Sequence, residues 1–252
     1  MSAQDPGEDR PERVDLGSLE TERRPEGVVG WVRWGLRTNH PAVSFVREVI
    51  GSVLAVVLVG LLLFAISGIW PPMVAVESGS MEPHMYQGDL VFVMEQHRLS
   101  PSFSTGETGV VTYEDAAARE AYRKFGDHGD VIVFEANGGR MTPVIHRARF
   151  FVDKGENWVG RANPTYLPAD TCSAVPNCPA PHAGFITKGD NNGRYDQVAG
   201  ISGPVRPAWV KGTAEFRVPW LGYVRLYFSE AQAGGAPARG VVSGASANAT
   251  LQ

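Results

Sequence analysis

Residues 77–93 read ESGSMEPHMYQGDLVFV and place Ser80 in a turn-rich stretch directly before an apolar segment. The last of these residues belong to LVFVM (90–94), whose β-branched and aromatic side chains are typical of a strand. The most hydrophobic run of the 252-residue chain lies just upstream. Two features therefore organise the sequence: a long apolar run, and a β-rich region that begins beside a serine.

Residues 49–70 form an uncharged run rich in Leu, Val and Ile. As a helix, this run would span roughly 33 Å, which matches the hydrocarbon core of a bilayer. Pro71 and Pro72 are expected to end the helix. A cleaved secretory signal is the alternative, but the long preceding segment and the length of the run favour an uncleaved anchor.

The charges beside the run predict its orientation. The flanking residues are Arg33, Arg37 and Arg47 before it, and Glu77, Glu82 and Asp89 after it. Since basic residues stay on the cytoplasmic side, we expect the N-terminus inside and everything after Trp70 outside. No later segment is long and apolar enough to cross back, so the sequence predicts a single-pass protein of the cell membrane.

Composition divides the remaining chain. The expected parts are a disordered cytoplasmic tail (1–26), a juxtamembrane segment (27–48), the transmembrane anchor (49–70), an extracytoplasmic β domain (71–229) with insertions at about 98–129 and 161–183, and a disordered C-terminal tail (230–252). Trp31 and Trp34 suit either the lipid headgroup level or a solvated linker. Asn248 begins an N-A-T triplet, which is either a glycosylation site or a chance match.

Short β-rich segments dominate the region after the anchor. The predicted strands are LVFVM (90–94), VIVFE (131–135), VIHRARFFV (144–152), FITK (185–188), WVKGTAEFRV (209–218) and YVRLYF (223–228), with DKG (153–155) as a hairpin turn into NWVG (157–160). Residues 113–125 are the one clear helical stretch. The pattern indicates a mainly β domain rather than an alternating βα one.

Ser80 can act as a nucleophile only if a base takes its proton and a third group orients that base. His146 is the one histidine inside a strongly strand-like run, and it faces away from Arg147 because strand side chains alternate. The alternative is a structural histidine. Asp190 and Asp196, in TKGDNNGRYDQ (187–197), could orient an imidazole or simply bond their own loop backbone.

Five segments in order behind the anchor resemble type I signal peptidases: SGSMEP, GDLV, VIHR, KGDNN followed by a further Asp, and PWLGYV. The resemblance covers residues 49–228. His146-Arg147 stands where bacterial members have lysine and arginine, whereas endoplasmic-reticulum and archaeal members have histidine. The resemblance thus implies a signal-peptidase-like β catalytic domain of the Ser/His subclass, and size and insertions favour an archaeal member.

The resemblance also implies roles for individual residues. Ser80 would be the nucleophile, His146 the general base and Asp196 the group that orients it, with Asp190 in support. Ser78 would be an oxyanion donor or, alternatively, an ordinary turn serine. No cofactor or metal is implied. Of the lysines, Lys188 is expected to pair with Asp190 and hence to be a poor base, and Lys124, Lys154 and Lys211 are not placed as the bacterial dyad requires.

The activity implied is that of a membrane-anchored serine endopeptidase, which removes signal peptides from exported preproteins after small residues at −1 and −3. Its expected partners are preproteins, membrane lipid and the translocation machinery, and the net charge of −4 argues against nucleic acid. Candidate groove walls, or simply core residues, are Met81, Met85 and residues 90–93. Trp220, Tyr223, Tyr227 and Phe228 would rest on the membrane interface or pack in the core.

Two other functions remain open from the sequence. One is an anchored, non-enzymatic β domain that binds exported proteins, and the other is a Ser/Lys self-cleaving protease on the same scaffold. Cys172 and Cys178 lie close enough for a disulfide on the outer side. A zinc site with His182 would lack a fourth ligand.

Overall fold

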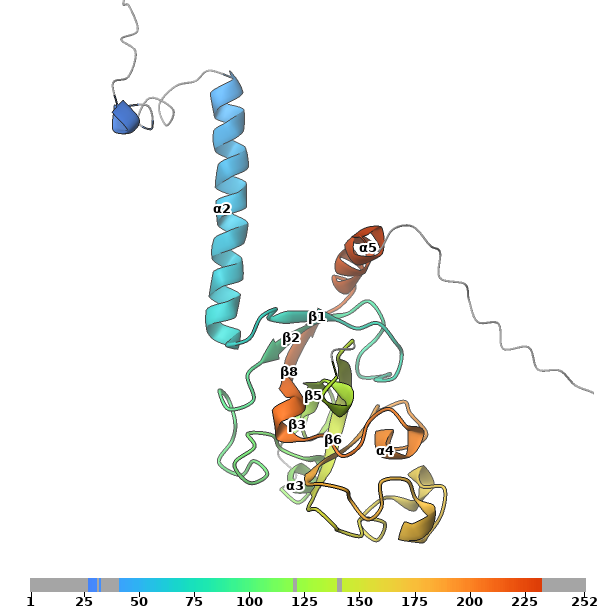
Figure 1. The fold of residues 1–252 in the computed structure, drawn as a ribbon. Helices are drawn as coiled ribbons and strands as arrows, with labels where there is room; N and C mark the ends of the chain where they lie inside the picture. The colour runs from blue at the N-terminus through green and yellow to red at the C-terminus, as the bar shows by residue number, and fades with distance from the viewer. Residues whose placement is uncertain (1–26, 31, 33–40, 120–121, 140–141, 233–252) are drawn as a thin grey trace, which may run out of the picture. The chain divides into compact units, whose positions relative to one another are not determined.

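The structure is a computed structural model that describes residues 27–30, 32, 41–119, 122–139 and 142–232 (Figure 1). The chain separates into two compact units, residues 1–59 and 60–252. The expected tail at 1–26, most of the tail at 230–252, Trp31, Trp34 and the triplet at Asn248 lie outside the described residues. Residues 27–30 and 32 are helical.

Helix α2 (Pro41–Ser67) is, among the described residues, the one helix long and apolar enough to cross a membrane. It begins and ends earlier than the apolar run at 49–70. Pro41 suits a first helical position because its missing N–H would have no partner there. Gly68 follows the last turn in the left-handed region, with φ at 77°, and its N–H donates to the Phe64 carbonyl. Glycine, rather than Pro71, therefore ends this helix.

The second unit is built on a six-stranded antiparallel sheet with the order β1-β2-β8-β5-β6-β7. Its strands are β1 (Met73–Ala75), β2 (Leu90–Met94), β5 (Val131–Phe134), β6 (Val144–Val152), β7 (Gly184–Lys188) and β8 (Val210–Val218). A small hairpin, β3 (Arg123–Lys124) with β4 (Asp127–His128), lies in the first insertion. The sequence thus predicts the sheet strands to within one residue, except for the edge strand β1.

Short helices complete the domain. They are α3 (Tyr113–Ala117), α4 (Asp196–Ala199), α5 (Gly222–Gln232) and the 3-10 turns η2 (Ala136–Gly138), η3 (Pro164–Tyr166), η4 (Cys172–Ala174) and η5 (Pro207–Trp209).

Three sequence predictions of secondary structure are wrong. YVRLYF (223–228) is part of helix α5, because its apolar residues also recur at helical spacing and β8 has already ended at Val218. NWVG (157–160) forms a turn without a strand partner. The helix predicted over 113–125 is only the five-residue α3, which Thr112 caps at its N-terminus.

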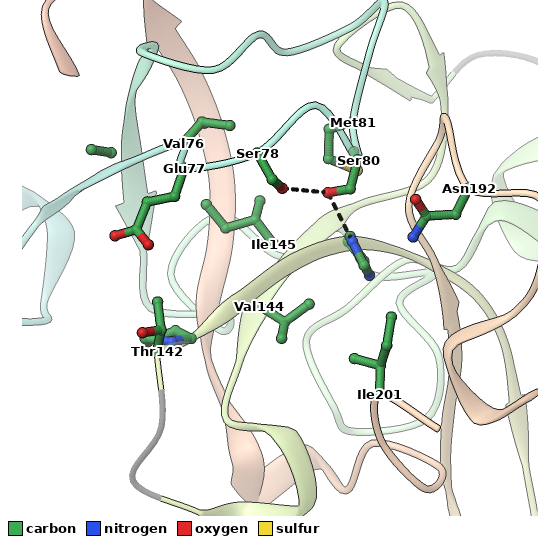
Figure 2. Close-up of a pocket in the computed structure, with 13 residues that line it drawn as sticks. Val76, Glu77, Ser78, Ser80, Met81, Thr142, Val144, Ile145, Asn192 and Ile201 are labelled. Carbon is green, nitrogen blue, oxygen red and sulfur yellow. Dashed lines mark hydrogen bonds between the residues drawn. The ribbon is translucent and has the colours of Figure 1, made fainter. Parts of the chain in front are cut away.

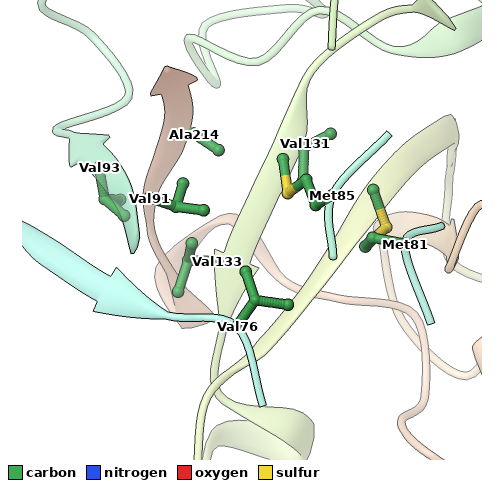
Figure 3. Close-up of a cluster of buried hydrophobic side chains, with 8 residues drawn as sticks. All are labelled: Val76, Met81, Met85, Val91, Val93, Val131, Val133 and Ala214. Atoms are coloured by element: carbon green, nitrogen blue, oxygen red, sulfur yellow. The ribbon is translucent and has the colours of Figure 1, made fainter. Parts of the chain in front are cut away.

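The core beneath the serine turn draws on both the sheet and the turn (Figure 3). The cluster consists of Val91, Val93, Val131, Val133 and Ala214 from the strands, and Val76, Met81 and Met85 from the segment between β1 and β2. Met81 and Met85 are almost completely buried, so both side chains pack in the core. These two side chains fasten the segment that carries Ser80 to the sheet.

A second cluster fills the insertion at 161–183 and reaches the start of α4. Trp158 and Tyr195 are buried with their rings edge to face, 6.0 Å apart, and the Tyr195 hydroxyl accepts a hydrogen bond from the Asn163 N–H at 3.0 Å. Cys172 and Cys178 form a disulfide. Because both sulfurs are in the disulfide, neither is free to bind zinc. The insertion also packs against Tyr195 and so supports the residue directly before Asp196.

Asp130 is a buried carboxyl that lies just before β5. Its oxygens accept hydrogen bonds from the Val111 N–H and the Tyr122 hydroxyl, each at 2.7 Å. Burial disfavours the charged form and raises the pKa of Asp130 to about 6, although these two hydrogen bonds oppose the shift. The unfolded chain therefore releases this proton at lower pH than the folded protein does.

Asp130→Asn should be more stable relative to the parent at pH 7 than at pH 4. The amide can still accept from Val111, whereas the parent must ionise a buried carboxyl as the pH rises through the window from about 4 to about 6. The free energy of unfolding of the parent should fall relative to the variant by about 2–3 kcal/mol across that window. Chemical denaturation in detergent at several pH values measures this difference, and a difference that does not change with pH would contradict the raised pKa.

Candidate active site

The turn that carries Ser80 is held by its own backbone. Between β1 and β2, the Met81 carbonyl accepts from the N–H groups of His84 and Met85 at 2.9 and 3.0 Å, and the Gly79 carbonyl accepts from that of Glu82 at 3.2 Å. Because Met81 is also buried in the core, the backbone of Ser80 has a fixed position while its side chain remains partly exposed.

His146 lies on β6, opposite Ile132 of β5, and is 4% exposed. Its Nε2 is 3.0 Å from Ser80 Oγ, and its Nδ1 is 2.7 Å from Asp196 Oδ2. Since an ionised carboxylate only accepts hydrogen bonds, Nδ1 carries a proton and Nε2 is free to accept the one on Ser80. The three side chains form one hydrogen-bonded chain.

Asp196 is fully buried at the first position of α4. Its Oδ2 also accepts a hydrogen bond from Thr187 Oγ1 at 2.7 Å, and the Gln197 amide donates to that hydroxyl at 3.3 Å. Sequence reasoning did not single out Thr187 or Gln197. The signal was available, because Thr187 is the second-last residue of β7, close to the loop, and Gln197 directly follows Asp196.

Asp190 is bound to a different group. Arg147 donates to both of its oxygens, from Nε at 2.9 Å and from Nη2 at 2.6 Å, and His84 Nδ1 lies 2.8 Å from Oδ2. Burial opposes the ionised form of Asp190, but Arg147 and then His84 more than offset it, and they hold its pKa below the usual range. The structure thus places Asp196 against His146 and Asp190 against Arg147.

Ser78 lies beside the nucleophile candidate. Its exposed hydroxyl donates a hydrogen bond to Ser80 Oγ at 3.2 Å, and the two side chains point toward one another (Figure 2). A hydroxyl at this place can donate to a group that approaches Ser80.

Lys188 does not pair with the Asp190 carboxylate, so that expectation is wrong. Its ammonium donates instead to three backbone carbonyls, those of Gly189 at 2.7 Å, Asp190 at 3.1 Å and Asn192 at 2.8 Å. It also lies 4.4 Å from the centre of the Tyr166 ring. Burial and the nearby charge of Arg149 lower the pKa of Lys188 from its usual value. The lysine therefore holds the loop after β7 in shape.

Ser80, Ser78 and His146 line a groove of about 600 Å³ (Figure 2). Its other lining residues are Ala75, Val76, Glu77, Met81, Thr142, Pro143, Val144, Ile145, Asn192 and Ile201. The pairing of β6 with β7 begins only at Arg147, so residues 144–146 have a strand neighbour on the β5 side alone. Such an open strand edge beside a mostly aliphatic wall can accept an extended peptide.

The curated proteins that resemble the chain include a fungal relative. The chain is 28% identical to the signal peptidase complex catalytic subunit sec11 of Neurospora crassa over 162 residues, which cover 63% of this chain and 64% of that protein. The chain is therefore a distant relative and spans less than two thirds of the length of the fungal protein. No family model matches the chain. This similarity supports a signal-peptidase-like domain with a mainly β sheet and an N-terminal apolar helix.

Lys188→Met should destabilise the protein by about 2–4 kcal/mol, because one buried and two partly buried carbonyl contacts lose their donor. Methionine keeps most of the apolar stem, so the loss reports on the ammonium. Lys211→Met is the matched control: Lys211 is half exposed and pairs with Glu135 at 3.0 Å, so its removal should cost less than about 1 kcal/mol. Thermal unfolding measures both, and equal effects would contradict the structural role of Lys188.

Proposed function

We propose that this chain is a membrane-anchored serine endopeptidase that cleaves N-terminal signal peptides from exported preproteins. The single observation that carries the proposal is the hydrogen-bonded chain Ser80–His146–Asp196 on the wall of a groove. The distant similarity to a signal peptidase catalytic subunit supports the choice of substrate class. The pairing of serine with histidine supports the Ser/His subclass, and an archaeal member remains our interpretation of size and insertions.

The proposed reaction follows from the hydrogen bonds. His146 Nε2 takes the proton from Ser80 Oγ as that oxygen attacks the scissile carbonyl, and then gives it to the leaving amine. Asp196 keeps the imidazole in the required tautomer and stabilises the imidazolium that forms, while Thr187 holds the carboxylate in place. A water molecule, activated by His146, then hydrolyses the acyl-enzyme.

The negative charge on the carbonyl oxygen needs donors where it develops. The backbone N–H of Ser80 and the hydroxyl of Ser78 are the candidates. Ser78 donates to Ser80 Oγ in the structure, and in the proposed reaction its hydroxyl would turn to the oxyanion instead. Asp190 does not take part directly in this scheme and acts through Arg147, which follows His146 on β6.

The groove suits a peptide with small side chains. In an extended peptide the residues at −1 and −3 point to the same wall, and Val76, Val144 and Ile145 would make the pockets there shallow and aliphatic. The preprotein would lie along the free edge of β6. Small residues at −1 and −3 are the pattern of signal-peptide cleavage sites.

The membrane arrangement is part of the same proposal. Helix α2 would anchor the protein with its N-terminus in the cytoplasm, so that the second unit acts on the outer face, where signal peptides emerge. Membrane lipid, preproteins and the translocation machinery are the proposed partners. The Ser80 hydroxyl has His146 and Ser78 as its hydrogen-bond partners among the described residues, which argues against a Ser/Lys dyad. A non-enzymatic binding domain would not need this arrangement.

Purified parent and variant proteins, incubated with a preprotein in lipid or detergent, test the proposal. Ser80→Ala and His146→Ala should lower the rate of cleavage by at least about 1000-fold. Asp196→Asn should lower it by about 100- to 10 000-fold through the wrong tautomer. Ser78→Ala should lower kcat by about 100-fold, because one oxyanion donor is lost while the backbone N–H remains.

Ser100→Ala removes a hydroxyl outside the groove and serves as the control, with unchanged cleavage expected. If Ser80→Ala still releases the signal peptide at the parent's rate, the mechanism is wrong. A parent that binds preprotein without cleaving it would support the non-enzymatic alternative.

We also propose that the start of helix α5 rests on the lipid surface. Trp220 is 77% exposed and Tyr227 73% exposed, and Tyr223 and Val224 between them are more than half exposed, so these residues do not pack in the core. Arg225 Nη1 donates to the Met73 carbonyl at 2.7 Å and fixes the helix to β1. Exposed tryptophan and tyrosine close together, here in the turn before α5 and in its first half, are typical of the membrane interface.

Replacing Trp220 and Tyr227 together by alanine should slow the cleavage of a preprotein embedded in lipid vesicles by about 5- to 10-fold, the effect of roughly 1 kcal/mol of lost interfacial binding. Cleavage of a short soluble peptide with the same cleavage site should keep the parent's rate. Equal losses on both substrates would show instead that the two aromatic side chains support the fold.

A further inference from the structure

His84 is a histidine next to the site that the proposed reaction does not use. It lies four residues after Ser80, in surroundings that indicate no strand, and the sequence therefore gave no reason to select it. In the structure its Nδ1 is 2.8 Å from Asp190 Oδ2, a residue 106 positions away. The His84 side chain is 26% exposed and that of Asp190 only 5%.

Asp190, the partner of His84, also forms an ion pair with Arg147. The guanidinium is completely buried, binds both oxygens of Asp190 and also donates to the Gly129 carbonyl at 2.9 Å. Arg147 directly follows His146 on β6. His84, Asp190 and Arg147 therefore form a continuous path from the serine turn, through the loop after β7, to the strand that carries the proposed base.

Three weaker contacts run beside this path. The Asn191 N–H donates to the Ser80 carbonyl at 2.9 Å, the Asn191 amide donates to the Gly79 carbonyl at 3.1 Å, and the Asp190 N–H lies 3.5 Å from Met81 Sδ. At Gly189, a Cβ would lie 2.6 Å from the Ser80 carbonyl oxygen, so the loop and the turn are in close contact. Among the described residues, the His84–Asp190 hydrogen bond is the contact between the turn and the loop whose acceptor is a carboxylate. A charged acceptor makes such a hydrogen bond stronger than one between neutral groups.

We propose that His84 is a positioning residue, which fastens the Ser80 turn to the Asp190–Arg147 ion pair and thereby keeps Ser80 Oγ within reach of His146 Nε2. The inference rests on the proposed function and adds a residue to it. Asp190 is held ionised by Arg147, so the hydrogen bond requires a proton on His84 Nδ1. An alanine at this position leaves Asp190 to Arg147 alone and releases the turn from the ion pair.

The distance that matters is the 3.0 Å between Ser80 Oγ and His146 Nε2. His146 is fixed by β6 and by Asp196, whereas Ser80 lies on a turn that Met81 and Met85 hold to the core and His84 holds to the loop after β7. Displacement of a reacting group by about 1 Å can cost 100-fold in rate. The groove walls on β6 do not depend on His84, so substrate binding should be preserved when the link is broken.

The test compares four full-length proteins in lipid: the parent, His84→Ala, His84→Asn and His97→Ala. Asparagine can offer an N–H near the position of Nδ1 and should restore the link. His97 is the matched control, because it pairs with a carboxylate, Glu95, at 2.6 Å but is exposed and outside the groove. Two quantities are measured: steady-state cleavage of a preprotein, and hydrogen exchange of the backbone amides at 189–192.

We expect His84→Ala to lower kcat by about 10- to 100-fold with KM changed less than about twofold. Exchange at 189–192 should rise in the same variant. His84→Asn should recover most of kcat and of the protection, and His97→Ala should behave as the parent in both measurements.

Each other outcome is informative. An unchanged kcat in His84→Ala, with or without faster exchange, overturns the positioning role. A loss of kcat that asparagine does not restore, with unchanged exchange, overturns it as well. If the parent cleaves no preprotein, the proposed function fails, and the exchange data alone then decide whether His84 fastens the turn to the loop.

Discussion

A buried arginine sets the arrangement of the site. A completely buried guanidinium is costly unless it is paired and hydrogen-bonded, because the interior cannot replace the water that it loses. Arg147 meets this requirement by drawing Asp190 from the loop after β7 and backbone carbonyls from the hairpin of the first insertion, including those of Lys124 and Gly129. Hydrogen bonds to the guanidinium of Arg147 thus hold the sheet, the loop and the insertion together.

Side chains alternate along β6, so the burial of Arg147 also decides the direction in which its neighbour His146 points. Because Arg147 points into the charged network, His146 points to the other side, toward Ser80 and Asp196. The serine reaches that side from a separate segment, whose Met81 and Met85 are buried in the core (Figure 3). Apolar packing therefore positions Ser80, and the neighbouring ion pair of Arg147 positions His146. The two side chains meet in the hydrogen bond between Ser80 Oγ and His146 Nε2.

The strands of this fold could be predicted because they are rich in β-branched and aromatic residues, and β2, β5 and β7 are also buried along their whole length. Residues 223–228 have the same composition, yet they form a helix, since composition alone does not distinguish a strand from a short helix that uses the same side chains. The edge strand β1 has three residues and gave no signal.

The candidate site was only partly visible in the sequence, for a similar reason. Local context selected Ser80 and His146, and the resemblance ranked Asp196 above Asp190. The residues alone could not separate the two acids, because both stand in one loop and only the path of the chain decides which one faces the imidazole. His84 was not selected because its surroundings are polar and indicate no strand, and its partner lies 106 residues away. Lys188 was assigned to a neighbouring carboxylate, although backbone carbonyls hold it.

The charges around the groove explain why the proposed base needs a carboxylate beside it. Arg147 and Lys188 are both buried cations close to the site, and they would repel a third positive charge on the protonated base. A neutral imidazole adds no charge at rest. When it takes the proton from Ser80, the resulting cation lies 2.7 Å from the carboxylate of Asp196, so the transient charge is compensated where it forms.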